Sequence, residues 1–291
     1  MGLLDLEKGL PNIQLSVGYL ANADIYKEEK PFFSNVPFFN IPGAKQHNLI
    51  TSFHDNINVL DIRGQEGAVS LDSHGFMLRT KEKVHYESKF WDEEWITKEY
   101  YLEIADFIKA QLGAAKVVIF DHTVRRADPE MPAYERGGLG KRQPSKMAHV
   151  DQTAESAEKR VRYHLKSEAV GGLEGRYQIV NCWHPLFGPL RDYPLILCDY
   201  STVDKAKDLK ASDLIFPHYL GEQYLCQYNP RHQWYYVKDQ CPNECWLFKW
   251  HDSDTSCARF TVHNSVHLPQ EANSEPPRPR ESIEFRSIVC Y

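Results

Sequence analysis

Short runs of β-branched and aromatic residues, separated by turn residues, dominate the second half of the chain, and they limit the possible fold most. Such runs predict strands. Two amphipathic segments precede most of them: one around Asp92–Leu112 that Gly113 can end, and a second over 153–169 that Thr153 can open. This order favours a mainly β fold with flanking helices around a double-stranded β-helix (jelly-roll, cupin-like) core. The predicted strands cover residues 177–184, 194–199, 223–228, 233–237, 245–250, 257–263 and 282–290.

The first half of the chain reads as strands and turns followed by the first helix. Alternating segments near residues 13–17 and 58–62 and an apolar run at 117–120 predict three further strands. A β-rich chain of 291 residues is commonly one domain. We therefore expect a single domain over 1–291, in which 1–115 pack as strands and a helix on a jelly-roll core of 116–291.

One short motif, His149-Val150-Asp151, places an imidazole and a carboxylate two residues apart. In a strand, residues i and i+2 point to the same face, so both side chains converge on one point. A second imidazole from a distant strand would complete two histidines and one carboxylate. This facial set leaves three positions of an octahedral Fe(II) open, and it is typical of non-haem iron oxygenases.

His263 is the best candidate for the distant imidazole, because it ends the strand-like run Arg259-Phe260-Thr261-Val262-His263. His251 is a rival, although it lies where an apolar strand gives way to a turn-rich segment. His267 is a weaker rival because Pro269 follows it closely. Without its context the His149–Asp151 spacing is also compatible with an ordinary surface strand or turn.

Arg280 and Ser282 form an Arg-x-Ser step that begins the last predicted strand. Arginine can bind a carboxylate through two parallel hydrogen bonds, and a hydroxyl on the same face adds a third donor. Arg278 competes for this role, but Pro279 pushes it outside the strand. The alternative for Arg280 is a surface ion pair with Glu281 or Glu284. A carboxylate clamp after the metal ligands is what binding of 2-oxoglutarate requires.

Five other residues are candidates for a substrate pocket. Asn181 and Trp183 share one face of a predicted strand, although core packing is an equal alternative for Trp183. The other candidates are His184, Thr123 and Arg125, and Arg125 suits an anionic substrate unless it is surface charge. Residues 126–146 are rich in Pro, Gly and charge, which fits either an active-site lid or a plain connecting loop.

Composition excludes several classes of protein. The net charge of −6 and the lack of a long basic run argue against nucleic acid as a partner. We find no signal peptide, and no apolar run approaches the roughly 18 residues of a membrane span.

Seven scattered cysteines predict reduced thiols and a cytoplasmic protein. A zinc site at Cys241, Cys245 and Cys257 is disfavoured because no second close pair follows. The oligomeric state is unknown.

The chain also resembles a family of fungal and bacterial natural-product oxygenases that groups the cephalosporin 7-alpha methoxylase subunit CmcJ, the hydroxylase/desaturase AsaB and gibberellin GA4 desaturase. The resemblance runs from about residue 35 to residue 291. It implies a non-haem iron oxygenase that hydroxylates or desaturates a secondary metabolite. The segments that carry it are 35–38, 54–55, 61–67, 120–126, 149–153, 228–236 and 279–284.

The chain departs from the family pattern at three places. The family pattern has an arginine at the position of His184; because an arginine there could bind a substrate anion, this change leaves the identity of the substrate open. It has proline where this chain has Val262, and Arg278-Pro279 is an addition before Arg280. The residues that match the family's metal ligands are unaffected by these changes.

Together these features predict an oxygenase that depends on Fe(II) and 2-oxoglutarate and uses O2 to hydroxylate, desaturate or oxidatively cyclise a small-molecule intermediate. His149, Asp151 and His263 would hold the iron, and Arg280 and Ser282 would hold 2-oxoglutarate. Two alternatives remain open. One is a non-haem iron oxidase without 2-oxoglutarate, in which the Arg-x-Ser step binds the substrate's carboxylate. The other is a non-enzymatic jelly-roll that binds a ligand or a partner.

Overall fold

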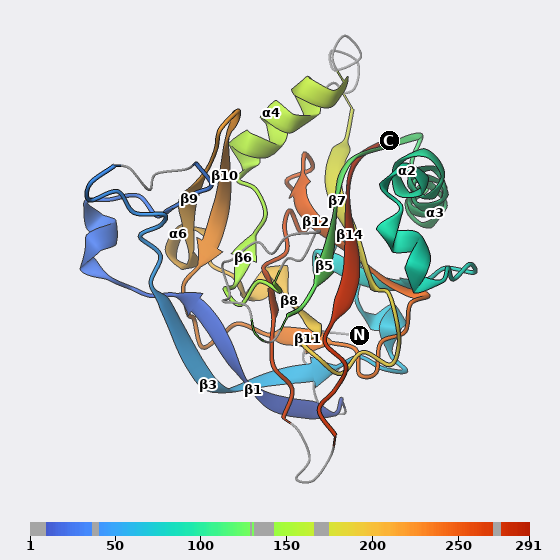
Figure 1. The fold of residues 1–291 in the computed structure, drawn as a ribbon, viewed down its shortest axis with the longest axis horizontal. Helices are drawn as coiled ribbons and strands as arrows, with labels where there is room; N and C mark the ends of the chain where they lie inside the picture. Colours follow the sequence, from blue (N-terminus) through green and yellow to red (C-terminus); the bar gives the residue numbers. More distant parts are fainter. Residues whose placement is uncertain (1–9, 37–40, 129, 131–142, 166–174, 270–274) are drawn as a thin grey trace.

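The computed structural model describes all residues except 1–9, 37–40, 129, 131–142, 166–174 and 270–274. Its core consists of two β-sheets that form a jelly-roll, as the sequence predicted (Figure 1). The larger sheet contains, in spatial order, β1 (Asn12–Leu20), β3 (Thr51–Asp61), β11 (Trp234–Tyr236), β8 (Leu195–Cys198), β13 (His263–Ser265), β6 (His149–Val150), β10 (Tyr219–Cys226), β9 (Leu209–Phe216) and β2 (Phe32–Ser34). The smaller sheet contains β4 (Phe76–Thr80), β12 (Glu244–Asp252), β7 (Tyr177–Pro185), β14 (Glu281–Cys290) and β5 (Lys116–Arg126).

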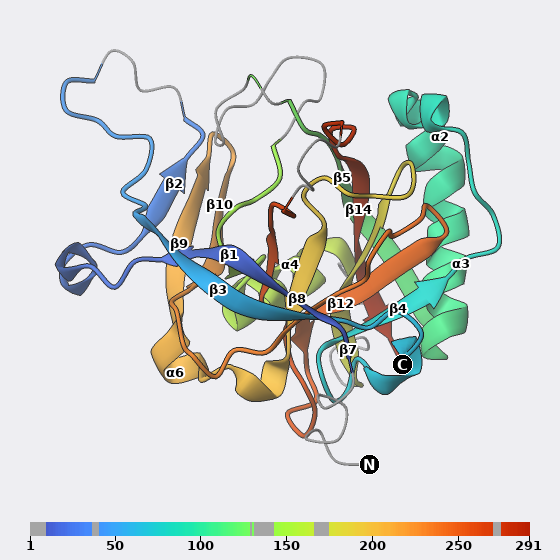
Figure 2. The ribbon, with the colours of Figure 1, turned by 90° about the horizontal axis from the view of Figure 1, so that it is seen from below.

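Strands from the N-terminal part extend both sheets. β4 pairs with β12, and β3 pairs with both β1 and β11. β1 and β3 lie across the end of the molecule opposite helix α4 (Ala154–Leu165), as the two views show (Figure 2). Residues before 115 are therefore built into the sheets through backbone pairing as well as packed on them.

The predicted first helix is present on the outer face of the smaller sheet (Figure 1). It comprises α2 (Glu93–Trp95), a π-helical turn (Ile96–Tyr100) and α3 (Tyr101–Leu112). The Asp92 carboxylate accepts a hydrogen bond from the Trp95 amide, and Gly113 ends the helix in the left-handed region at φ 62°. Ile104 and Ile108 pack against the sheet, and full burial of such a side chain stabilises the fold by about 1.5–3 kcal/mol.

One further long helix, α4, and several short turns are also described. The second predicted helix begins at Ala154, as Thr153 indicated, and residues 166–169 of the prediction lie outside the described part of the chain. Single turns occur at α6 (Lys205–Asp208), Asp24–Lys27, Glu66–Ala68, Glu87–Trp91 and Tyr200–Thr202. Within the described residues, no helix has both the length and the apolar character needed to cross a membrane.

One strand prediction needs correction, and two further strands were missed. The strand predicted over 257–263 begins only at His263, because here the chain crosses between sheets: the Thr261 amide donates to Lys249 of β12, whereas the Val262 carbonyl accepts from Cys198 of β8. β4 and β9 were not predicted.

Much of the proposed lid, residues 126–146, lies outside the described residues. Free thiols are present at Cys182, Cys198, Cys226, Cys241, Cys245 and Cys257.

Candidate metal centre

Two neighbouring strands of the larger sheet bring the predicted metal ligands together. β6 and β13 are antiparallel, and His263 lies directly opposite His149. Asp151 follows β6 by one residue. Its Oδ1 lies 3.4 Å from His149 Nε2 and 3.8 Å from His263 Nε2. One ligand atom from each of the three residues lies within 4.8 Å of the others, which is a spacing that one metal ion can bridge.

Backbone carbonyls fix both imidazole rings. His149 Nδ1 donates to the Met147 carbonyl at 2.8 Å, and His263 Nδ1 donates to the Thr261 carbonyl at 3.3 Å. When Nδ1 carries the hydrogen, Nε2 keeps its lone pair. Both Nε2 atoms therefore face Asp151 as potential ligands, in the tautomer that metal-binding histidines usually adopt.

The electrostatics of the three residues also suit a cation. Burial, together with the neighbouring His149, lowers the pKa of His263 to about 3, so this imidazole is neutral at pH 7. Burial alone would raise the pKa of the Asp151 carboxyl, but His263 and His149 outweigh burial and hold that pKa well below its usual range. A neutral imidazole beside an ionised carboxylate is the state in which these groups bind metal.

Arg280 is almost fully buried, and three polar groups hold it in place. Its amide donates to Asp192 Oδ2, and its Nη1 donates to the Tyr193 carbonyl and to Ser265 Oγ, each at 2.7 Å. Its guanidinium lies 5.7 Å from the centre of the Trp183 ring. Burial and the nearby Arg125 lower the pKa of Arg280 to about 9, so it remains a cation at neutral pH.

Arg280 and Ser282 each keep one polar atom without a partner. Arg280 Nε and Ser282 Oγ are buried and have no hydrogen-bond partner among the described residues. Such groups are rare in folded proteins, because each costs roughly 1–3 kcal/mol. A carboxylate between them would satisfy both, so the site fits the acid group that the sequence predicted for it.

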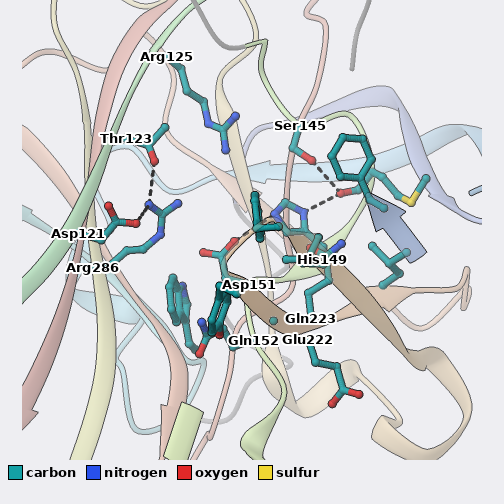
Figure 3. A pocket seen from close by; sticks show the side chains of 18 of the residues that line it. Asp121, Thr123, Arg125, Ser145, His149, Asp151, Gln152, Glu222, Gln223 and Arg286 are labelled. Atoms are coloured by element: carbon teal, nitrogen blue, oxygen red, sulfur yellow. Dashed lines mark hydrogen bonds and ion pairs between the residues drawn. The ribbon is translucent and has the colours of Figure 1, made fainter. Parts of the chain in front are cut away.

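A cavity of about 350 Å³ opens beside His149 and Asp151 (Figure 3). Thr123 and Arg125 of β5 line it, as predicted for substrate contacts. Arg125 also donates to the Gln143 carbonyl, and Thr123 accepts from Arg286. Apolar rings line other parts of the wall, namely Phe33, Phe120, Phe216, Tyr219 and Trp250. Rings and cations around a candidate metal site suit a small organic substrate.

The other three pocket candidates do not line this cavity. Trp183 is buried between the sheets beneath Arg280. Asn181 donates through Nδ2 to Asp151 Oδ2 at 2.8 Å. His184 lies on the opposite face of β7, where its Nδ1 donates to the Pro185 carbonyl and its Nε2 accepts from Tyr100. The position where the family pattern has arginine therefore lies outside the described cavity.

The rival ligands lie elsewhere. His251 stacks on Tyr177, and His267 packs on Tyr193. Arg278 pairs at the surface with Glu87. Asp72, Asp252 and Cys257 form a second group of potential metal ligands. Lys249 and Arg176 form ion pairs with both of its carboxylates.

Sequence reasoning missed several polar residues around the site. Ser265 lies two positions after His263 and therefore on the same face of β13. The spacing of these two residues in the sequence could have identified Ser265. Glu284 and Arg286 continue the inward face of β14 after Ser282. The contacts of Arg280 with Asp192 and Tyr193 have no such signal, because they join distant parts of the chain.

The chain is similar in sequence to known proteins. A family profile described as "Oxidoreductase/YMDC permease-like domain" matches residues 17–290. The alpha-ketoglutarate-dependent dioxygenase tstK of Talaromyces stipitatus is 33% identical over 246 residues, which cover 81% of this chain and 84% of that protein. The hydroxylase/desaturase efuI of Hormonema carpetanum is 33% identical over 252 residues, covering 80% and 82%.

A solved structure shares the fold. The iron and alpha-ketoglutarate-dependent endoperoxidase NvfI superposes with a TM-score of 0.81 at 22% identity, over 96% of this chain and 98% of that one.

Proposed function

Because this chain belongs to the family of Fe(II)/2-oxoglutarate-dependent dioxygenases of fungal secondary metabolism, we propose that His149, Asp151 and His263 are its iron ligands. We further propose that Arg280 and Ser282 bind 2-oxoglutarate. The observation that carries the proposal is the convergence of one ligand atom from each of the three residues within 4.8 Å. The buried donors without partners at Arg280 and Ser282 support the second part.

The chain's own residues position the reactants. Met147 and Thr261 orient the two imidazoles, and Asp151 supplies the negative charge of the metal site. Arg280, held by Ser265, offers a cation to the acid group of the cosubstrate. When bound, Fe(II) and 2-oxoglutarate supply the O2-dependent oxidation, and the protein supplies orientation and a site shielded from water.

We propose that the substrate is a small-molecule natural-product intermediate that enters the cavity beside Asp151 and is hydroxylated, desaturated or oxidatively cyclised. The named relatives include dioxygenases and hydroxylase/desaturases, so an oxidase without 2-oxoglutarate and a non-enzymatic binding protein are not favoured.

We propose in addition that residues 1–291 act as a single oxygenase domain. Strand pairing that joins the N-terminal part to both sheets supports this. Free thiols at six cysteines (Cys182, Cys198, Cys226, Cys241, Cys245 and Cys257) support action in the cytoplasm, where thiols stay reduced. The negative net charge makes nucleic acid an unsuitable partner.

Loss of a metal ligand tests the proposal. Purified protein with Fe(II), ascorbate and O2 should convert 2-oxoglutarate to succinate, and Asp151→Ala or His149→Ala should reduce this conversion to background. His251→Ala serves as the matched control, because this histidine lies away from the cavity, and it should retain the conversion. Substantial succinate formation by an iron-loaded Asp151→Ala protein would contradict the ligand assignment. An iron-loaded parent that oxidises a substrate without forming succinate would favour the oxidase without 2-oxoglutarate.

A further inference from the structure

Asn181 links the proposed metal ligand Asp151 to a second buried acid. It lies in the middle of β7, and its side chain is fully buried. Its Nδ2 donates to Asp151 Oδ2 at 2.8 Å and also contacts Glu284 Oε1 closely. Glu284 comes from the neighbouring strand β14, and its Oε1 lies 3.8 Å from Arg286. One amide nitrogen thus bridges carboxylates from two different elements.

The orientation of this amide is fixed by its neighbours. An amide nitrogen has two hydrogens to donate, whereas an amide oxygen can only accept. Because both neighbours are carboxylate oxygens, the nitrogen must face them, and a reversed amide would place three acceptors together. The Asn181 Oδ1 atom is buried and has no partner among the described residues. The fold thus tolerates an unsatisfied oxygen at a position where both amide hydrogens are used.

We propose that Asn181 is the positioning residue that fixes the Asp151 carboxylate for the metal. The amide occupies Oδ2, so Oδ1, which faces both histidine Nε2 atoms, is the oxygen that remains for the ion. Asp151 then contributes one ligand atom, and together with the histidines this leaves three octahedral positions open. The inference rests on the proposed function, because it assumes that Asp151 binds the metal.

Glu284 takes part as the anchor of the amide. Without it, Asn181 could follow Asp151 as that side chain rotates. With Glu284 in contact, the amide is held from the side of β14, while β7 holds its backbone. Partners that orient metal ligands typically change metal affinity about 10- to 100-fold when they are removed. We expect a loss of this size here.

Co(II) binding tests the proposal without relying on turnover. The parent and the variants Asn181→Asp and Asn181→Ala are titrated with Co(II) alone, and the visible absorption bands report both affinity and ligand geometry. Gln178→Glu is the matched control. Gln178 is also a buried amide on β7 that donates to a carboxylate, Asp252 Oδ2 at 2.7 Å, but it is not part of the metal site. Urea unfolding of each protein records the change in stability.

The expected result is Co(II) binding that is about 10- to 100-fold weaker in both Asn181 variants, with altered band positions, and unchanged in Gln178→Glu. Unchanged affinity and bands in a folded Asn181 variant would overturn the positioning role, as would an equal loss in Gln178→Glu. If Asn181→Asp does not fold, the Asn181→Ala protein decides the question. A parent that fails to bind Co(II) would refute the metal site itself, which is a different outcome from parent-like binding by the variants.

Discussion

Ser282 and Arg280 share an uncommon property, which is a buried polar atom without a hydrogen-bond partner among the described residues. Folding removes both atoms from water, and a protein under selection for stability alone would replace or satisfy them. The simplest physical reason to keep them is a ligand that supplies the missing acceptor. Arg280 carries the charge, whereas the Ser282 hydroxyl can be removed with little change in volume.

We predict that Ser282→Ala leaves the stability of the ligand-free protein unchanged or raises it slightly, because an unsatisfied hydroxyl is removed. Its affinity for 2-oxoglutarate should fall roughly 10- to 100-fold, as expected for one hydrogen bond to a charged group. Urea unfolding and a 2-oxoglutarate titration of the iron-loaded protein measure the two effects.

Ser287→Ala provides the matched control on the same strand. Its buried hydroxyl donates to the Val180 carbonyl at 2.7 Å, so its loss should lower the free energy of unfolding by about 1 kcal/mol and leave 2-oxoglutarate affinity intact. A Ser282→Ala protein that is clearly destabilised and binds 2-oxoglutarate normally would mean that the hydroxyl has a structural role.

The sequence pattern identified the three residues that the structure brings together. His149 and Asp151 are two positions apart, and His263 lies in a strand-like run. The Arg-x-Ser step was identifiable for the same reason. Asn181 was placed in the substrate pocket, whereas it contacts Asp151, because a hydrogen bond between side chains thirty residues apart leaves no local signal. His184 was also expected in the pocket and lies on the other face of β7.

At the scale of elements, β1 supports both strands that carry the proposed ligands. The Gly18 carbonyl accepts from the Ala148 amide at 2.8 Å and from Asn264 Nδ2 at 3.1 Å. Ala148 precedes His149, and Asn264 follows His263. A single peptide of an N-terminal strand therefore helps to fix the distance between the two histidines.

Gly18 is required at this contact for steric reasons. A Cβ atom there would lie 2.2 Å from the Lys146 carbonyl oxygen, so the backbone would have to move. We predict that Gly18→Ala lowers the free energy of unfolding by about 1–3 kcal/mol and weakens metal binding, because it separates β1 from β6. Urea unfolding and Co(II) titration test this.

Gly67→Ala is the control for the preceding substitution, because a Cβ at Gly67 would meet nothing within 4 Å. Its free energy of unfolding should stay within about 0.5 kcal/mol of the parent. Parent-like stability and metal affinity in Gly18→Ala would contradict the proposed support of the ligand strands by β1.

A helix whose first and last turns carry capping residues was predictable from sequence. The helix from Asp92 to Leu112 has a capping carboxylate and a left-handed glycine, and the structure confirms it. The strand predicted over 257–263 was wrong for most of its length, because apolar alternation also arises where a chain crosses between two buried sheets. β9 was missed because its run Lys210-Ala211-Ser212-Asp213 is largely polar.

At the scale of the whole molecule, the jelly-roll was predictable and its strand order was not. The number of short strands indicates the architecture, whereas pairs such as β4 with β12 join residues more than 160 positions apart. The parallel pairing of β11 with β3 is equally remote in sequence. These pairings complete the two sheets that carry the site, so its framework depends on contacts that no local pattern encodes.

The central claim is that one site holds both iron and 2-oxoglutarate. Its most direct test is the visible absorption spectrum of the protein without oxygen, recorded after addition of Fe(II) and then of 2-oxoglutarate. Arg280→Ala is the test variant, and Arg278→Ala, at a surface ion pair, is the control. We predict a weak charge-transfer band that requires both additions, persists in Arg278→Ala and needs much more 2-oxoglutarate in Arg280→Ala. Iron binding without such a band, or no iron binding, would contradict the claim.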